Sequence, residues 1–344
     1  MPRASRTALS TLALLAAASL VPAAVPAAEA PSTSAPPDAI DPDATTFAYP
    51  YPVSFFELQS QRQPLRMAYI DAAAPQPNGR TAVLLHGKNF GAGDWATTIA
   101  SLNRAGFRVI APDQIGFGKS SKPERYQFSF IQLAANTRAL LASLGIARSV
   151  VVGHSMGGML AVRYALSYPE ATERLVLVDP IGLENYAALV PPRTVDDWYA
   201  QELKQTPESV RAYQRDAYYG GAWTPEYEAH TRLLAGWTRH PQWSRVAWDS
   251  ALTYDMIFNQ PIVADLPRIR APTRLIIGLR DRTALGKAFA RPEVAKTMGD
   301  YTRLGKETQR RIPGADLVEL PGVGHAPQVE AFPEFERALL GFVR

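Results

Sequence analysis

The sequence contains no cysteine among its 344 residues. This absence excludes disulfide bonds, a thiolate nucleophile, iron–sulfur clusters and every metal site with cysteine ligands. The chain also has no long block of charges of one sign, although its formal net charge is +4. A surface that binds nucleic-acid phosphates needs clustered basic side chains. We therefore expect no nucleic-acid partner.

The N-terminal region contains an apolar stretch, from about residue 8 to residue 21, that is too short for a membrane span of about 20 residues. It follows Arg3 and Arg6 and precedes an alanine-rich run that ends at Ala30. This order is typical of a secretory signal peptide. We predict a cleaved signal peptide at residues 1–28, and hence a periplasmic or secreted protein. An uncleaved, stable membrane anchor is the alternative, which the absence of a basic flank after the stretch disfavours.

The remaining chain divides into a linker and one domain. Residues 29–46 are rich in proline, serine, alanine and aspartate without an apolar period, which is typical of a flexible linker. Over residues 47–344, short apolar runs alternate with helical patterns, which predicts an α/β domain with a mostly parallel sheet. The expected strands are Val53–Gln59, Leu65–Asp71, Thr81–Leu85, Arg108–Ala111, Ser149–Val152, Arg174–Val178, Thr273–Ile277 and Asp316–Leu320. The expected helices are Trp95–Arg104, Phe130–Leu144, Met156–Ser167 and Glu334–Val343.

Two segments interrupt this alternation. Residues 182–258 show no strand pattern and hold five of the six tryptophans, so we predict an inserted helical cap there. Its aromatic side chains are expected either to line a pocket for an apolar or aromatic substrate or to form the cap's own small core. The second segment, Thr283–Arg310, reads as irregular and is longer than an ordinary connection with one helix.

The motif Gly153-His-Ser-Met-Gly157 carries the strongest chemical signal. It follows the apolar run Val150–Val152 and opens a helical pattern, which is the strand–turn–helix context of a nucleophile elbow. The turn needs a strained backbone at Ser155, and the glycines leave room for the close packing around it. We therefore predict that Ser155 is the nucleophile.

A serine nucleophile needs a histidine base. His325 is the one histidine suitably placed, because it lies in a Gly/Pro-rich loop just after the last expected strand. His86 is expected to bond to backbone, and His154 lies in the elbow but faces away from the attacking side. His230 and His240 are expected to have surface or packing roles.

The base in turn needs an acid that fixes its tautomer. Asp281 follows the strand Thr273–Ile277 and is the favoured acid. Asp179, at the end of Arg174–Val178, is the competitor. Asp113 is expected to have a structural role at the end of its strand.

Hydrolysis through a serine also needs donors for the oxyanion. One is expected to be the backbone N–H of Met156, the residue after the nucleophile. The second should come from the glycine-rich loop that begins at His86-Gly87, with Lys88 N–H as the first choice and Asn89 N–H as the second. The alternative for this loop is a simple flexible turn.

Taken together, the chain resembles the α/β-hydrolase superfamily from about residue 55 to residue 343. The resemblance rests on motifs that occur in the family's order: His86-Gly87, Asp113-Gln-Ile-Gly-Phe-Gly-Lys-Ser120, Gly153-His-Ser-Met-Gly-Gly158, Gly278-Leu-Arg-Asp281 and Gly324-His325. It implies an eight-stranded sheet with flanking helices and an inserted cap. The elbow is similar to those of microbial carboxylesterases, non-haem haloperoxidases and carbon–carbon bond hydrolases. A serine nucleophile speaks against epoxide hydrolases and haloalkane dehalogenases, and the loop after His86 is not that of proline iminopeptidases.

The expected activity is hydrolysis of a small carboxylic ester by Ser155, His325 and Asp281, without a metal or other cofactor. A carbon–carbon bond hydrolase and a perhydrolase, which would use the same three residues, are the alternatives, and a non-catalytic binding protein is disfavoured. The sequence is silent on oligomeric state.

Overall fold

The computed structural model describes residues 1, 2, 36 and 38–344. Apart from its first two residues, the predicted signal peptide lies outside the described residues. No helix in the described part of the chain is long and apolar enough to cross a membrane.

A single sheet of eight strands forms the centre of the domain, in the order β1-β2-β4-β3-β5-β6-β7-β8. Strand β2 is antiparallel to β1 and β4, and all other neighbouring pairs are parallel. The eight predicted strands and the mostly parallel sheet are therefore confirmed. The strands are β1 Val53–Ser60, β2 Gln63–Ala72, β3 Thr81–Leu85, β4 Arg108–Pro112, β5 Ser149–His154, β6 Thr172–Val178, β7 Thr273–Gly278 and β8 Asp316–Leu320.

Helices cover both faces of the sheet. Apolar side chains of α2, α3 and α10 pack on one face, and those of α1 and α12 pack on the other. The continuously apolar strands β3, β5, β6 and β7 need this double cover, because a strand buried on both faces has no polar side. The helices are α1 Ala96–Arg104, α2 Phe130–Ser143, α3 Met156–Ser167, α4 Tyr186–Leu189, α5 Val195–Glu202, α6 Pro207–Ala217, α7 Pro225–Thr238, α8 Trp243–Asn259, α9 Pro292–Ala295, α10 Tyr301–Arg311, α11 Pro327–Glu330 and α12 Phe332–Val343.

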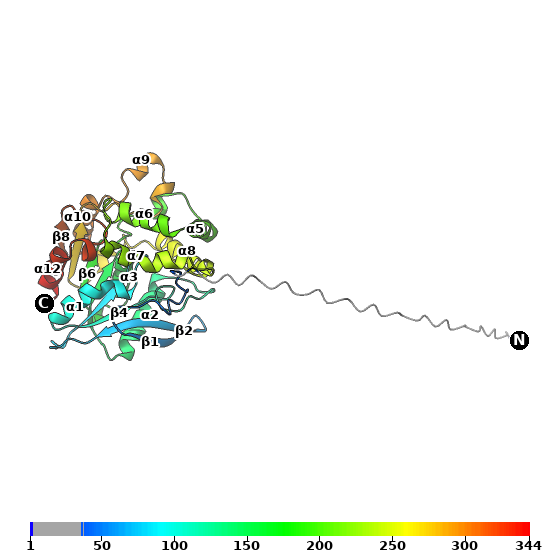
Figure 1. The fold of residues 1–344 in the computed structure, drawn as a ribbon, viewed down its shortest axis with the longest axis horizontal. Helices are drawn as coiled ribbons and strands as arrows, with labels where there is room; N and C mark the ends of the chain where they lie inside the picture. The colour runs from blue at the N-terminus through cyan, green and yellow to red at the C-terminus, as the bar shows by residue number, and fades with distance from the viewer. Residues whose placement is uncertain (3–35, 37) are drawn as a thin grey trace. The chain divides into compact units, whose positions relative to one another are not determined.

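The segment between β6 and β7 is helical, as the sequence predicts. It contains α4 to α8, and Figure 1 shows α5, α6, α7 and α8 grouped together. Helix α5 packs against α8, and α6 packs against α7. We refer to residues 182–259 as the cap.

The stretch Thr283–Arg310 is more regular than its sequence indicates. Its last part forms α10, whose Tyr301 and Leu304 are buried against the sheet. The helix is hard to recognise in the sequence because most of its other residues are polar or charged.

The predicted flexible linker differs from the structure over residues 38–46, while residues 29–35 and 37 lie outside the described residues. Ala44 is buried in a cluster with Trp237 and Trp243 of the cap. The indole N–H of Trp237 donates to the carbonyl of Asp41 at 3.0 Å. These contacts fix the segment on α7 and α8. The composition of the segment did not predict these contacts, because only a few of its apolar side chains, among them Ile40, make them.

Asp249 of α8 is a buried carboxylate at the junction between the cap and the loop that contains Gly116. Neither of its oxygens has a hydrogen-bond partner among the described residues. Burial raises the pKa of Asp249 well above its usual value, although the charges of Lys122 and Arg245 act in the opposite direction.

The raised pKa of Asp249 predicts a pH-dependent effect of Asp249→Asn on stability. The folded protein retains a proton that the unfolded chain releases near pH 4, so this group makes wild-type stability fall as pH rises, by at most about 1.4 kcal/mol per pH unit, up to the folded pKa. The variant lacks this contribution, so its stability relative to wild type should increase from pH 5 to pH 8. Urea titrations across this range measure the difference, and equal slopes for the two proteins would contradict the prediction.

Candidate active site

Ser155 lies in the sharp turn between β5 and α3, at the carboxyl end of its strand. Its backbone has φ 55° and ψ −120°, which is the strained conformation that the motif predicts. The flanking glycines are required, since a Cβ on Gly157 would lie 2.1 Å from the carbonyl oxygen of Leu85. A Cβ on Gly153 would lie 2.1 Å from the carbonyl oxygen of Gly157. The glycines thus let the turn pack against the end of β3.

Three predicted residues, Ser155, His325 and Asp281, form one hydrogen-bonded chain. His325 Nδ1 lies 2.6 Å from Asp281 Oδ2, and His325 Nε2 lies 2.8 Å from Ser155 Oγ. An ionised Asp281 accepts a hydrogen bond from Nδ1–H, which leaves Nε2 free to accept one from the serine hydroxyl. Each residue follows a parallel strand, β5, β7 or β8, and the carboxyl ends of these strands meet at one edge of the sheet.

The orientation of Asp281 is fixed by its own neighbours. Its second oxygen, Oδ1, accepts the backbone N–H of Thr283 at 2.7 Å. The guanidinium of Arg282 donates to the Asp281 carbonyl at 2.6 Å. Asp281 and His325 are both fully buried, so no water competes for the bond between them.

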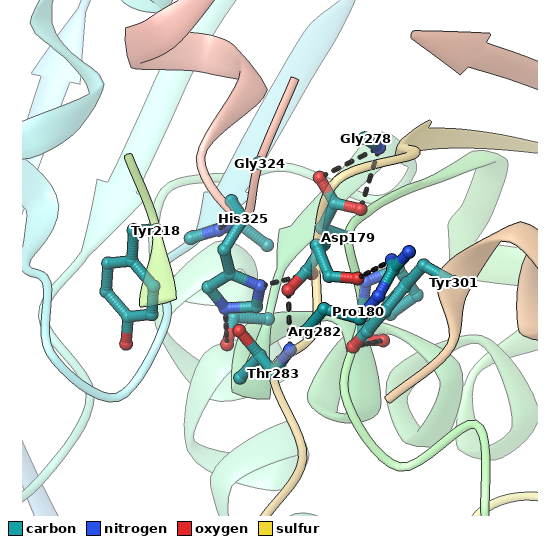
Figure 2. A network of polar contacts seen from close by, with 12 residues as sticks. Asp179, Pro180, Tyr218, Gly278, Arg282, Thr283, Tyr301, Gly324 and His325 are labelled. Carbon is teal, nitrogen blue, oxygen red and sulfur yellow. Dashed lines mark hydrogen bonds and ion pairs between the residues drawn. The ribbon is translucent and has the colours of Figure 1, made fainter. Parts of the chain in front are cut away.

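Asp179, the competing acid, lies close by but faces away from the histidine. Its carboxylate accepts the backbone N–H of Gly278 at 2.9 and 3.2 Å, and Figure 2 shows it turned toward Gly278. Burial raises its pKa well above the usual value, and the negative charge of Asp281 raises it further. The structure therefore joins Asp281, and not Asp179, to His325.

The two expected oxyanion donors come from two segments next to Ser155, the start of α3 and the loop after β3. Met156 is the first residue of α3, and its N–H has no hydrogen-bond acceptor among the described residues. The N–H groups of Lys88 and Asn89 likewise have no acceptor in residues 38–344. The loop that carries them packs against Ser155, because a Cβ on Gly87 would lie 3.0 Å from the Cβ of Ser155.

The remaining histidines have structural partners. His86 Nδ1 donates to the carbonyl of Gly87 at 2.8 Å, and its Nε2 accepts the N–H of Gln114, as expected of a histidine bonded to backbone. His154 Nε2 lies 2.7 Å from the carbonyl of His325, so the turn that contains Ser155 contacts the loop that contains His325, which the sequence did not indicate. His230 Nδ1 lies 2.7 Å from Asp94, and the ring of His240 accepts a nearby backbone N–H.

Asp113 has the structural role that its position predicts. Its carboxylate accepts the hydroxyl of Tyr49 at 2.8 Å and the backbone N–H groups of Ala92 and Lys119 at 2.7 and 2.9 Å. It thereby joins the segment after the linker to two loops at the edge of the sheet.

A cavity of about 960 Å³ opens beside Ser155 and is lined by the cap and by residues 282–289. The cavity wall includes five aromatic residues: Trp198, Tyr213, Tyr218, Tyr254 and Phe289. The stretch Thr283–Arg310, which also interrupts the alternation of strands and helices, therefore forms part of the cavity wall.

The cap also contacts His325 directly, through Tyr218. Its ring lies 4.8 Å from that of His325, centroid to centroid, and Figure 2 shows the two rings side by side. Its carbonyl faces the Gly324 backbone that precedes His325, since a Cβ on Gly324 would lie 2.0 Å from that oxygen. No local motif marks Tyr218, and only its place in an aromatic-rich insertion could have drawn attention to it.

Comparison with known proteins shows the family of the chain. Residues 82–338 match the alpha/beta hydrolase family. A 2-hydroxy-6-oxononadienedioate/2-hydroxy-6-oxononatrienedioate hydrolase from Burkholderia vietnamiensis is 31% identical over 290 residues, which are 81% of this chain and 91% of that protein. A hydrolase of the same name from Comamonas testosteroni is 38% identical over 110 residues, but the match spans only 31% of this chain and 38% of that protein.

Among solved structures, a probable hydrolytic enzyme from Pseudomonas aeruginosa PAO1 superposes with a TM-score of 0.88 at 54% sequence identity. The superposition covers 89% of this chain and 98% of the other. The family match extends over most of the chain and includes Ser155, Asp281 and His325. The chain therefore belongs to the alpha/beta hydrolase family, and it is a hydrolase.

Proposed function

We propose that this hydrolase cleaves a carboxylic ester through an acyl-enzyme. The observation that carries the proposal is the chain from Ser155 Oγ to His325 Nε2, and from His325 Nδ1 to Asp281 Oδ2, at 2.8 and 2.6 Å. His325 takes the proton of Ser155 as Oγ attacks the ester carbonyl carbon. Asp281 stabilises the imidazolium that forms and holds the ring in the required tautomer.

The negative charge that develops on the carbonyl oxygen is stabilised by the backbone N–H groups of Met156 and Lys88. Both groups lack an acceptor in the described part of the chain, as donors reserved for a reaction intermediate should. Collapse of the tetrahedral intermediate breaks the bond to the alcohol, which leaves with the proton held by His325. His325 then activates a water molecule, which releases the acid from Ser155.

The substrate we propose is a small ester with an apolar or aromatic group. Trp198, Tyr213 and Phe289 all contribute to the wall of the cavity. Aromatic walls favour an apolar ligand, and a few polar groups fix its orientation. The cavity volume of about 960 Å³ is enough for a ligand of that size.

Carbon–carbon bond hydrolysis is the second candidate, and the relatives favour it. The Burkholderia vietnamiensis protein, which this chain matches over nearly its full length, is named as the hydrolase of a dienedioate. In such a reaction the same serine and histidine would act at a ketone carbonyl, and the carbon–carbon bond would break to leave a carbanion that takes up the proton held by His325. The basic side chain of Arg193, which lines the cavity, suits an acidic substrate.

A side-by-side assay separates the two candidates. We expect turnover of p-nitrophenyl butyrate to exceed that of 2-hydroxy-6-oxo-6-phenylhexa-2,4-dienoate by about 100-fold or more in kcat/KM, a difference of about 2.7 kcal/mol in activation free energy. The rate of hydrolysis of each compound by the purified protein is followed by absorbance. A higher kcat/KM for the dienoate than for the ester would replace the proposed ester hydrolysis by carbon–carbon bond hydrolysis.

A further inference from the structure

The loop that carries Lys88 and Asn89 is closed at its start by bonds among its own residues and is held at its far end by Asp113. The carbonyl of Gly87 accepts hydrogen bonds from His86 Nδ1 and from the N–H of Phe90, at 2.8 and 3.1 Å. At the other end, the N–H of Ala92 donates to Asp113 at 2.7 Å. Neither set of bonds includes the backbone groups of Lys88 or Asn89, where the oxyanion donors lie.

The middle of the loop is held by the cap, through side chains. The ammonium of Lys88 donates to Ser250 Oγ at 2.5 Å and lies 3.8 Å from a carboxylate oxygen of Glu202. It also lies 3.7 Å from the centroid of the Tyr254 ring. Ser250 in turn donates to the carboxylate of Glu202. We call these three cap residues, Glu202, Ser250 and Tyr254, the lysine clasp.

The neighbouring residue is bound to the cap in the same way. The side-chain amide of Asn89 donates to the hydroxyl of Tyr218 at 2.8 Å. Tyr218 is the residue whose ring packs on His325. The cap therefore contacts both the loop that supplies an oxyanion donor and the base.

Stability alone does not account for the lysine clasp. The side chains of Lys88 and Glu202 are only 9% and 3% exposed, so both charges have lost most of their hydration. Buried ion pairs generally add little net stability, because the loss of hydration offsets the attraction. A buried pair that joins two separate elements is better suited to fixing their relative geometry, a role that has to be tested in each protein.

We propose that Glu202, Ser250 and Tyr254 are positioning residues, which hold the oxyanion loop in its active geometry through the side chain of Lys88. The docked cap thereby completes the oxyanion hole. The inference rests on the proposed function, since it requires a serine attack that creates an oxyanion. The backbone N–H of Lys88 makes the catalytic contact, and its ammonium keeps that N–H in place.

The test uses variants that remove the clasp but leave every backbone N–H. Lys88→Met removes the ammonium, Ser250→Ala removes its closest partner, and Ser250→Thr keeps the hydroxyl. Lys122→Met is the matched control, because Lys122 is also a buried lysine but binds backbone carbonyls away from the loop. The full-length proteins are compared in kcat and KM for an aryl ester, and in the maximal rate of inactivation by a fluorophosphonate.

The fluorophosphonate is informative because its phosphoryl oxygen occupies the oxyanion hole during attack by Ser155, whatever the natural substrate is. We expect Lys88→Met and Ser250→Ala to lower both kcat and the inactivation rate by about 10- to 100-fold, somewhat less than the loss of a whole oxyanion donor. KM should stay within about threefold. The double variant should be no slower than the slower single variant, because both act through one contact. Ser250→Thr and Lys122→Met should stay within about threefold of wild type.

Different outcomes overturn different statements. If the fluorophosphonate does not label the wild type, the proposed function fails and this inference fails with it. If it labels the wild type and Ser250→Ala at the same rate, the clasp has no positioning role and the proposed function stands. A rise in KM for an acidic ester with unchanged kcat would instead make the Lys88 ammonium a substrate contact. If Lys88→Met does not fold, the kcat and inactivation rate of Ser250→Ala and Glu202→Gln test the same inference.

Discussion

Replacement of Ser155 by alanine is expected to lower kcat/KM for an aryl ester by about 10⁴-fold or more, the loss seen when a serine hydrolase loses its nucleophile. The hydroxyl is the only group removed, and it lies 2.8 Å from His325 Nε2. Alanine differs from serine only by that oxygen, so the Cβ of residue 155 should stay at the same position in the strained turn. The fold and melting temperature should change little.

The measurement is steady-state kinetics, together with mass spectrometry of the fluorophosphonate-treated proteins. Wild type should gain one adduct on the peptide that contains Ser155, and the variant should gain none. Ser143→Ala, which changes a serine at the end of α2 that bonds the carbonyl of Leu140, is the control and should keep wild-type kinetics. Undiminished turnover by Ser155→Ala would remove Ser155 from the mechanism.

The confirmed strands, and the local geometry predicted around Ser155, depend on short stretches of chain. The run Val150–Val152, the two glycines and the helix that follows are all within twenty residues of Ser155, and they specify the elbow by local geometry. The strands β3, β5, β6 and β7 were visible because residues buried on both faces leave a continuous apolar run. His325 and Asp281 could be chosen because parallel strands bring their carboxyl ends to one edge.

The features that the sequence did not reveal depend on contacts between distant residues. Lys88 and Ser250 are 162 residues apart, and Asn89 and Tyr218 are 129 residues apart. No spacing or motif relates such pairs without an alignment or a structure. The packing of Ala44 on the cap was missed for the same reason, because a composition typical of a linker does not exclude a few specific contacts.

Replacement of Asp281 by asparagine is expected to lower kcat by about 10³- to 10⁴-fold. The backbone N–H of Thr283 donates to Asp281 Oδ1, so it should hold the oxygen of the new amide on its side. The amide NH₂ would then face His325 Nδ1, which could no longer donate there. The ring would shift to the tautomer with hydrogen on Nε2, and that nitrogen could not accept the proton of Ser155. Kinetics across the pH range, with circular dichroism as a check of the fold, measures this effect.

Asp179→Asn is the matched comparison, because Asp179 follows the neighbouring strand β6 and is equally buried. Its carboxylate accepts the N–H of Gly278 and does not contact His325. An asparagine oxygen can accept the same bond, so kcat should fall by less than about tenfold. The burial that raises the pKa of Asp179 favours its neutral form, which could not stabilise an imidazolium. A larger loss for Asp179→Asn than for Asp281→Asn would assign the acid to β6, against the hydrogen-bond geometry.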